Sequence, residues 1–251
     1  MNCELKEIIM SLKIVVLAKQ VPDTRNVGKD AMKADGTVNR AALPAIYNPE
    51  DLNALEQALR LKEIHLGSTV HVLTMGPSRA AEVIRESMFR GADGGYLLTD
   101  RKFAGADTLA TSYALSCALR KIGADLIIAG RQAIDGDTAQ VGPELAEMLG
   151  IEHASNVVGI AEATDTHITV TLDLDGALQT QRMELPCLIT VEKDINSPRL
   201  PSYLKKRAMH DGCIRVFTAE DFPGADLKRL GQRGSPTRVE SIFPPESRGA
   251  A

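Results

Sequence analysis

Residues 48–74 read NPEDLNALEQALRLKEIHLGSTVHVLT, a helix pattern followed by a strand pattern, and this stretch decides the fold class. Asn48 can cap a helix, Pro49 suits its first turn, and the two acids that follow suit the positive end of the helix dipole. From Asp51 to Ile64 apolar side chains recur every three or four residues, which is the period of a helix with one buried face. After Gly67 the run TVHVLT predicts a short buried strand.

The same alternation of strand and helix extends to about residue 150. The expected strands are 13–19, 69–74, 96–98 and 125–129, and the expected helices are 51–64, 78–90, 107–122 and 143–149. Such alternation predicts a parallel sheet with helices packed on it. Beyond it, 167–174 and 177–185 alternate with period two around Asp175-Gly176, a hairpin signal, and 187–192 is another apolar run. We therefore expect an α/β fold: an open, mostly parallel sheet with an antiparallel hairpin addition.

The composition is that of a globular protein, with 44% hydrophobic residues, 25% charged residues and a formal net charge of −4. It excludes global disorder, and it offers no general basic field for nucleic acid or an anionic membrane. Residues 199–238 nevertheless contain nine basic and four acidic residues, a net charge of +5 that leaves −9 on the rest of the chain. We expect an N-terminal extension over 1–11, an acidic α/β domain over 12–195, and over 196–251 an extended basic arm with little core of its own, which lies on a partner.

The cysteines and histidines form no metal-binding pattern. The 4 Cys contain no C-x-x-C pair and the 5 His no H-x-x-x-H pair, so we expect neither a metal centre nor a disulfide framework. The N-terminus carries Glu4 and Glu7 and lacks the apolar core of a signal peptide, and no apolar run is long enough to cross a bilayer. These features predict a reducing, cytoplasmic location.

Four segments are expected at the carboxyl ends of the strands, where open parallel sheets bind their ligands. They are 18–24, 48–51, 75–78 and 130–141. The sequence QVPDTRN after the first strand lacks the G-x-G-x-x-G of dinucleotide-binding folds and also lacks a Walker phosphate loop. Any nucleotide must therefore be held by a different loop.

The best candidate loop is 130–141, GRQAIDGDTAQV. Gly130 permits a close approach of the backbone, and Arg131 offers a planar, charged fork that suits a phosphate. The alternative is that these residues form a polar surface loop that binds no ligand. No general base or nucleophile identifies itself anywhere in the chain.

A helix is expected directly after this loop. Asp137 or Thr138 can cap it, with Gln140 completing an Asp-x-x-Gln box, and the free N–H groups of its first turn would then form an anion site. Pro143 lies too far inside to be the first helical residue of such a helix, so it either kinks that helix or begins a second one.

The sequence GRQAIDGDTAQVGPELAE around this loop resembles the signature of the electron-transfer flavoprotein beta subunit family. KIVVLAKQVPDT, NPEDLNALEQALRLKE, VHVLTMGP, the RGAD step and INSPRLPSYLKKRA resemble the same family in order, from about Leu12 to Met209. The resemblance implies a nucleotide-hydrolase-like (Rossmann-like) core and an obligate heterodimer with an alpha subunit. It further implies an electron carrier rather than a stand-alone enzyme. Electrons would pass from dehydrogenases, such as acyl-CoA dehydrogenase, through an FAD held mainly by the alpha subunit to a further acceptor.

The resemblance also implies which residues bind, position by position, and it implies no catalytic residue and no metal. The implied cofactor-binding residues are Ala18, Val21, Asp23, Thr24, Asn48, Pro49, Glu50, Asp51, Met75, Gly130, Arg131, Gln132, Ala133, Ile134, Asp135, Gly136, Asp137, Thr138, Ala139, Gln140 and Val141. A dehydrogenase would dock on the segment that contains Pro198 and Arg199, with Tyr203 or Leu204 as its apolar anchor. The basic arm would clasp the alpha subunit.

Members of this family bury either AMP or, in the electron-bifurcating type, a second FAD that NADH reduces. The AMP-binding type tends to carry Lys at the position of Arg131 and lacks the V-P-D-T that this chain has at 21–24. We therefore expect a second FAD, with 21–24 near its ring system and NAD(H), and keep AMP as the alternative.

Two hypotheses of other classes stay open beside the electron carrier. One is a nucleotide-binding sensor without a redox role, which does not explain the docking-like segment or the basic arm. The other is an ATP-pyrophosphatase-like enzyme of the same fold. That enzyme would need an S-G-G-x-D-S type loop after the first strand, which QVPDT does not supply.

Overall fold

A computed structural model describes residues 11–23 and 44–237 of the chain, so Thr24 lies outside the described residues, as do residues 1–10 and 238–251.

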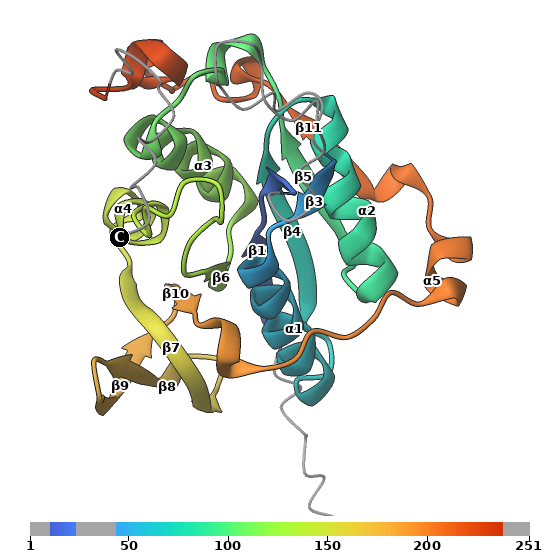
Figure 1. Cartoon of the computed structure of the whole chain (residues 1–251), viewed down its shortest axis with the longest axis vertical. Helices are drawn as coiled ribbons and strands as arrows, with labels where there is room; N and C mark the ends of the chain where they lie inside the picture. Colours follow the sequence, from blue (N-terminus) through green and yellow to red (C-terminus); the bar gives the residue numbers. More distant parts are fainter. Residues whose placement is uncertain (1–10, 24–43, 238–251) are drawn as a thin grey trace, which may run out of the picture.

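The main feature is a 9-stranded sheet in the order β11-β5-β4-β1-β6-β10-β7-β8-β9 (Figure 1). Its strands are β1 (Lys13–Leu17), β4 (Thr69–Met75), β5 (Gly94–Leu98), β6 (Leu126–Gly130), β7 (Glu152–Ala163), β8 (His167–Leu174), β9 (Ala177–Glu184), β10 (Cys187–Val191) and β11 (Ile214–Phe217). The pairs from β11 to β7 are parallel, and β7, β8 and β9 pair antiparallel. The expected α/β fold class is confirmed.

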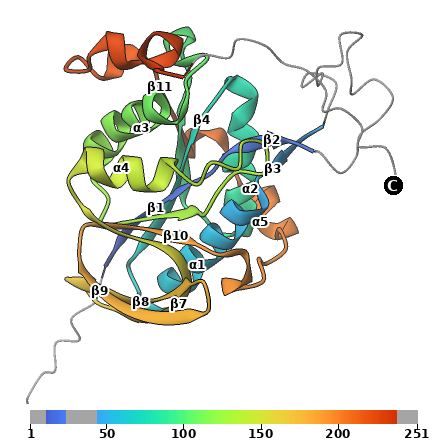
Figure 2. The ribbon, with the colours of Figure 1, turned by 60° about the vertical axis from the view of Figure 1, so that its left-hand side comes forward.

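Helices cover both faces of the sheet, because successive side chains of a strand point to opposite sides. Ile14 and Val16 of β1 pack with α1 (Pro49–Ile64) and α2 (Ala81–Arg90), whereas Val15 and Leu17 pack with α3 (Thr108–Ile122) and α4 (Val141–Leu149). Figure 2 shows the two pairs of helices on opposite sides of the strands. The residues described include no helix that is long and apolar enough to cross a membrane.

Two strands differ from the expectation for the region after residue 150. The strand β7 was not predicted, because two register shifts interrupt its pairing with β8 and leave only an irregular apolar pattern. The run 187–192 was expected beside the antiparallel hairpin. Instead, β10 lies between β6 and β7 and is parallel to both, and all five of its residues are buried.

The C-terminal segment contributes more to the core than expected. Strand β11 pairs with β5 at the edge of the main sheet. Phe217, Phe222 and Leu230 are buried in the cluster that includes α3 and α4. The expectation of little core is therefore wrong for this part of the segment, and the proposed division at residue 195 stays a prediction.

The start of α4 also differs from the sequence analysis. The helix begins at Val141 after Gln140, and no side-chain hydrogen bond caps it, so the expected Asp-x-x-Gln box is wrong. Asp137 and Ala139 instead adopt positive φ angles of 47° and 53°, an uncommon conformation for residues other than glycine. Pro143 neither kinks this helix nor begins a second one. It lies in the first turn, where a missing N–H breaks no helical hydrogen bond.

Candidate functional site

The loop that follows β6 lies against the first turn of α1. A Cβ at Gly130 would lie 2.6 Å from Asp51 Oδ1 and 2.7 Å from the carbonyl carbon of Glu50. Glycine is therefore required here because the backbone of α1 approaches the end of the strand closely. This close approach brings together two of the four segments that the sequence analysis placed at the carboxyl edge of the sheet.

Side chains from the start of α1 hold the backbone of the loop. Asn48 is completely buried. Its Nδ2 donates to the carbonyl oxygen of Gln132 over 2.9 Å, and its Oδ1 accepts from the N–H of Ile134 over 3.1 Å. Glu50 Oε2 accepts from the N–H of Gln132 over 2.9 Å. The Asn48 side chain does not cap α1, as the sequence suggested, because both of its polar atoms bind the loop.

Asp51 joins the loop to the end of β1. Its side chain is buried, and Oδ2 accepts from the backbone N–H of Lys19 over 2.8 Å. Burial raises the pKa of Asp51 to about 7, although Asn48 and the N–H groups of Lys19 and Gly130 stabilise the carboxylate. The charge of this residue therefore changes near neutral pH.

We predict that the stability of the protein depends on pH through Asp51. Because its pKa is raised from 3.8 to about 7 on folding, its contribution is complete below the lower value and is lost as pH rises through the higher one. Between about pH 4 and pH 7 the wild type should lose stability relative to Asp51→Asn, by at most about 1.4 kcal/mol per pH unit. Urea unfolding at several pH values measures this difference.

His71 gives a second pH-dependent contribution to stability, which the wild type and the variant share. Burial lowers the pKa of His71, which changes stability with pH in the opposite sense, but this contribution is common to both proteins and cancels in the difference. Parallel stability curves for the wild type and the variant would contradict the prediction.

A cavity of about 550 Å³ opens at the carboxyl ends of β1, β4 and β6, a volume within the usual range of ligand pockets. Of the residues that the sequence analysis named, it is lined by Ala18, Asp51, Met75, Gly130, Arg131, Gln132, Ala133, Asp135, Gly136, Asp137, Thr138, Ala139, Gln140 and Val141. Ile134 does not line it. Asn48, Pro49 and Glu50 do not line it either, although Asn48 and Glu50 hydrogen-bond to the backbone of the loop.

A second cavity of about 230 Å³ adjoins the first. Val21 and Pro22 line it, and Lys19 and Asp135 line both cavities. Lys19 Nζ lies 2.6 Å from Asp135 Oδ1, so an ion pair stands where the two cavities meet. The buried Asp23 lines neither cavity, and its backbone N–H donates to the carbonyl oxygen of Pro44 over 2.8 Å.

The wall of the larger cavity that faces the loop was missed from the sequence. It is formed by Phe103, Gly105, Ala106, Asp107, Thr108, Thr111 and Leu115, from the connection after β5 and the start of α3. A signal for this wall is present in the sequence, because the expected helix 107–122 begins at Asp107, whose side chain caps α3 and accepts from the N–H of Ala110 over 3.0 Å. What was missed is that a capped helix after a parallel strand begins at the ligand-binding edge.

Two helix starts and Arg131 offer groups for an anionic part of a ligand, although four aspartates also line the cavity: Asp51, Asp107, Asp135 and Asp137. The first turns of α3 and α4 both line it, and N–H groups at helix starts attract anions. Arg131 Nη1 lies 3.2 Å from Glu192 Oε1, whereas its buried Nε has no hydrogen-bond partner among the described residues. A buried donor without a partner is costly, and a phosphate oxygen would satisfy it. The residues present therefore fit a nucleotide.

The residues expected to dock a partner line neither cavity. Tyr203 and Leu204 begin the short helix α5 (Tyr203–Ala208), and each is 73% exposed. Arg199 behaves differently, because its guanidinium turns toward α1 of the same chain and pairs with Glu56 and Glu63.

Comparison with known proteins agrees with this arrangement. The electron transfer flavoprotein domain matches residues 35–221. The chain belongs to the electron transfer flavoprotein family. It is 43% identical over 238 residues to the electron transfer flavoprotein subunit beta of Clostridium acetobutylicum, a match that covers 95% of this chain and 90% of that relative.

Other members of the electron transfer flavoprotein family match as extensively. The caffeyl-CoA reductase-Etf complex subunit CarD of Acetobacterium woodii is 41% identical over 239 residues, covering 95% of this chain and 90% of CarD. Protein FixA of Azorhizobium caulinodans is 41% identical over 244 residues, covering 94% and 86%. This chain therefore has the electron-transfer role of a beta-type subunit, in a family associated with flavin and AMP-related cofactors. The comparisons support the electron carrier over the sensor and the pyrophosphatase-like enzyme.

Proposed function

We propose that this chain holds a second FAD in its own cavities, beside the FAD shared with an alpha subunit, and that NADH reduces this second FAD. The observation that carries the proposal is the pair of adjoining cavities. AMP needs only one compartment, whereas a dinucleotide can extend from the larger cavity past Lys19 and Asp135 into the smaller one. The Val21 and Pro22 of the V-P-D-T sequence line the smaller cavity, where the ring system would lie.

Each group of residues has a role in this proposal. The first turns of α3 and α4 and the free Nε of Arg131 bind the phosphates. Asn48 and Glu50 fix the loop backbone in place before the ligand arrives, which lowers the entropic cost of binding. A bound flavin supplies the redox chemistry, accepting a hydride and releasing electrons singly or in pairs. The protein contributes binding, orientation and the exclusion of water.

The nucleotide content of the purified protein tests the proposal. The chain is co-expressed with its alpha subunit, the complex is denatured, and FAD and AMP are quantified by chromatography. We expect two FAD and no AMP per heterodimer, and NADH should bleach the absorbance of the flavin. One FAD and one AMP per heterodimer would instead establish the non-bifurcating alternative, in which AMP is structural.

We also propose that residues 196–206, called the docking segment below, bind an acyl-CoA dehydrogenase or a related dehydrogenase. Tyr203 and Leu204 supply exposed apolar surface, and the exposed, positively charged Lys205 and Lys206 follow them directly in the chain. Exposed apolar side chains rimmed by charge are typical of a protein interaction site. The basic C-terminal arm would contact the alpha subunit.

A further inference from the structure

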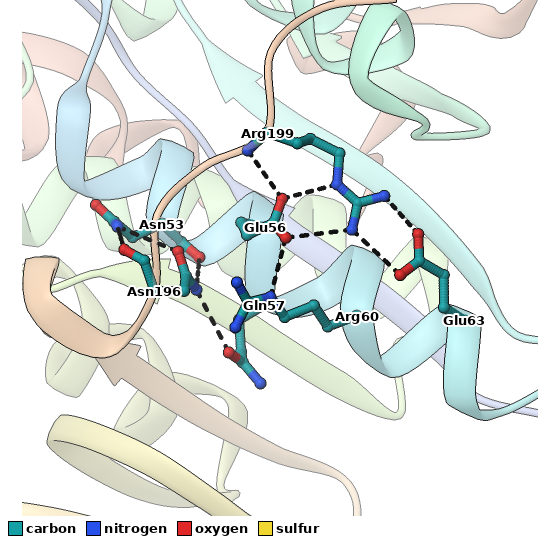
Figure 3. A network of polar contacts seen from close by, with 7 residues as sticks. All are labelled: Asn53, Glu56, Gln57, Arg60, Glu63, Asn196 and Arg199. Carbon is teal, nitrogen blue, oxygen red and sulfur yellow. Dashed lines mark hydrogen bonds and ion pairs between the residues drawn. The ribbon is translucent and has the colours of Figure 1, made fainter.

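Arg199 is the most extensively bound side chain of the docking segment. Its Nε lies 2.7 Å from Glu56 Oε2, its Nη2 lies 3.2 Å from Glu56 Oε1, and its Nη1 lies 2.5 Å from Glu63 Oε1 (Figure 3). The Glu56 side chain is only 6% exposed. Each of the three guanidinium nitrogens therefore has a partner on α1, and the group is not directed at another protein.

The backbone around Arg199 is fixed as well. Its N–H donates to Glu56 Oε2 over 3.1 Å, and its carbonyl oxygen accepts from Arg90 Nε of α2 over 3.1 Å. Three residues earlier, Asn196 exchanges hydrogen bonds with Asn53 of α1, at 2.8 Å from Asn53 Nδ2 to the Asn196 carbonyl and 3.0 Å from Asn196 Nδ2 to the Asn53 carbonyl. Figure 3 shows both attachments along the same helix.

The residues that follow Arg199 are the exposed ones. Leu200 is 86% exposed, and Tyr203 and Leu204 are each 73% exposed. Leu200 was not singled out in the sequence, yet it lies directly beside the fixed backbone. The chain is thus held at Asn196 and Arg199, and again at Ser202, whose N–H donates to the carbonyl oxygen of Phe89 over 2.8 Å. The exposed apolar side chains lie beside these points.

We propose that Arg199 is a positioning residue for partner binding: Glu56 and Glu63 clamp it, and the clamp presents Leu200, Tyr203 and Leu204 to an apolar pocket with an acidic rim on the dehydrogenase. The inference rests on the proposed docking role of this segment. It replaces the expectation that Arg199 itself contacts the partner. A segment ordered in advance binds more tightly because less conformational entropy is lost on association.

The charges on α1 maintain the clamp. Burial disfavours the Glu56 carboxylate, but hydrogen bonds from Arg199 and Arg60 outweigh this effect and lower its pKa. The hydrogen bond from Arg199 likewise lowers the pKa of Glu63. Both glutamates therefore stay charged at neutral pH.

The test uses Arg199→Ala, Glu56→Gln and the double variant in the complete heterodimer. The probe is whichever acyl-CoA dehydrogenase of the host reduces the wild-type complex fastest. The KM for this dehydrogenase should rise about tenfold in either single variant, while kcat stays unchanged. The double variant should show no further rise, because both changes release the same clamp. In the absence of a partner, trypsin should also cleave all three variants faster than the wild type after Lys205 and Lys206.

Arg60→Ala is the matched control. Arg60 also pairs with Glu56, at 2.9 Å, and helps to keep it charged, but it lies on α1 itself, so its removal leaves the bonds from Arg199 to Glu56 and Glu63 in place. This variant should keep the KM and the tryptic cleavage rate of the wild type. A KM that rises with Arg199→Ala but not with Glu56→Gln would overturn the inference, because it would mean direct contact of Arg199 with the partner.

A further variant separates this inference from the proposed docking role. Replacing both Tyr203 and Leu204 with alanine should raise the KM whether or not the clamp exists. If the KM rises in this double variant but in neither clamp variant, the clamp inference fails and the docking role stands. If the KM rises in none of them, the docking role fails, and the clamp inference fails with it.

Discussion

Replacing Gly130 with alanine is expected to abolish retention of the nucleotide and to lower the free energy of unfolding by about 2–3 kcal/mol. The added Cβ would lie 2.7 Å from the carbonyl carbon of Glu50, a backbone atom that cannot turn aside as a side chain can. The first turn of α1 must then move away from β6, and it carries Asn48 and Glu50, which hold the loop. Chromatography of released nucleotides and urea unfolding measure the two effects.

Gly224→Ala is the matched control, at a glycine that lines neither cavity. No atom of the described part of the chain lies within 4 Å of the position that its Cβ would take, and its backbone is outside the left-handed region. We expect this variant to keep both its nucleotide and its stability. Equal behaviour of the two alanine variants would show that the contact of Gly130 with α1 is not what shapes the site.

Replacing Asn48 with alanine is expected to weaken nucleotide binding about a hundredfold, because one buried side chain supports two points of the loop. The change leaves the carbonyl oxygen of Gln132 and the N–H of Ile134 without their partner. The loop can regain hydrogen bonds only by moving toward water, which displaces the lining residues Arg131 and Ala133. Titration of the nucleotide-depleted heterodimer with FAD and with AMP measures the affinity.

Asn53→Ala gives the complementary control on the same helix. Asn53 is also buried, but its Nδ2 donates to the carbonyl oxygens of Lys193 and Asn196 rather than to the loop. We expect this variant to bind nucleotide like the wild type and to show faster tryptic cleavage in the docking segment. Loss of nucleotide affinity in both variants would contradict separate roles for the two ends of α1.

The candidate site could be predicted where its signals are local in the chain. The loop at 130–141 was found because a glycine and an arginine follow a short apolar run directly. Ala18 and Met75 were named through family resemblance, and both line the cavity. The wall formed by residues between 103 and 115 was missed because its sequence shows only a helix start, and the role of that helix start depends on which strand lies beside it.

The roles of Asn48 and Arg199 show a different limit. Asn48 stands where a helix cap is expected, and Arg199 lies in a basic, partly exposed segment, so local patterns predict a cap and a partner contact. Their actual partners lie 84 and 143 residues away in the chain. Such pairs form only when the sheet brings distant segments together, so they cannot be predicted from the neighbouring sequence.

The sequence by itself determined the α/β class, the edge of the sheet where the cavity-lining loop lies, and the family, because periodicity, caps and motifs are properties of neighbouring residues. The tertiary structure decided the rest. It placed β10 inside the parallel sheet and β11 at its edge, where hydrogen bonding between distant strands fixes the order. It also made α1 the common support of the loop and the docking segment, because one buried helix face can hold two segments that are far apart in the chain.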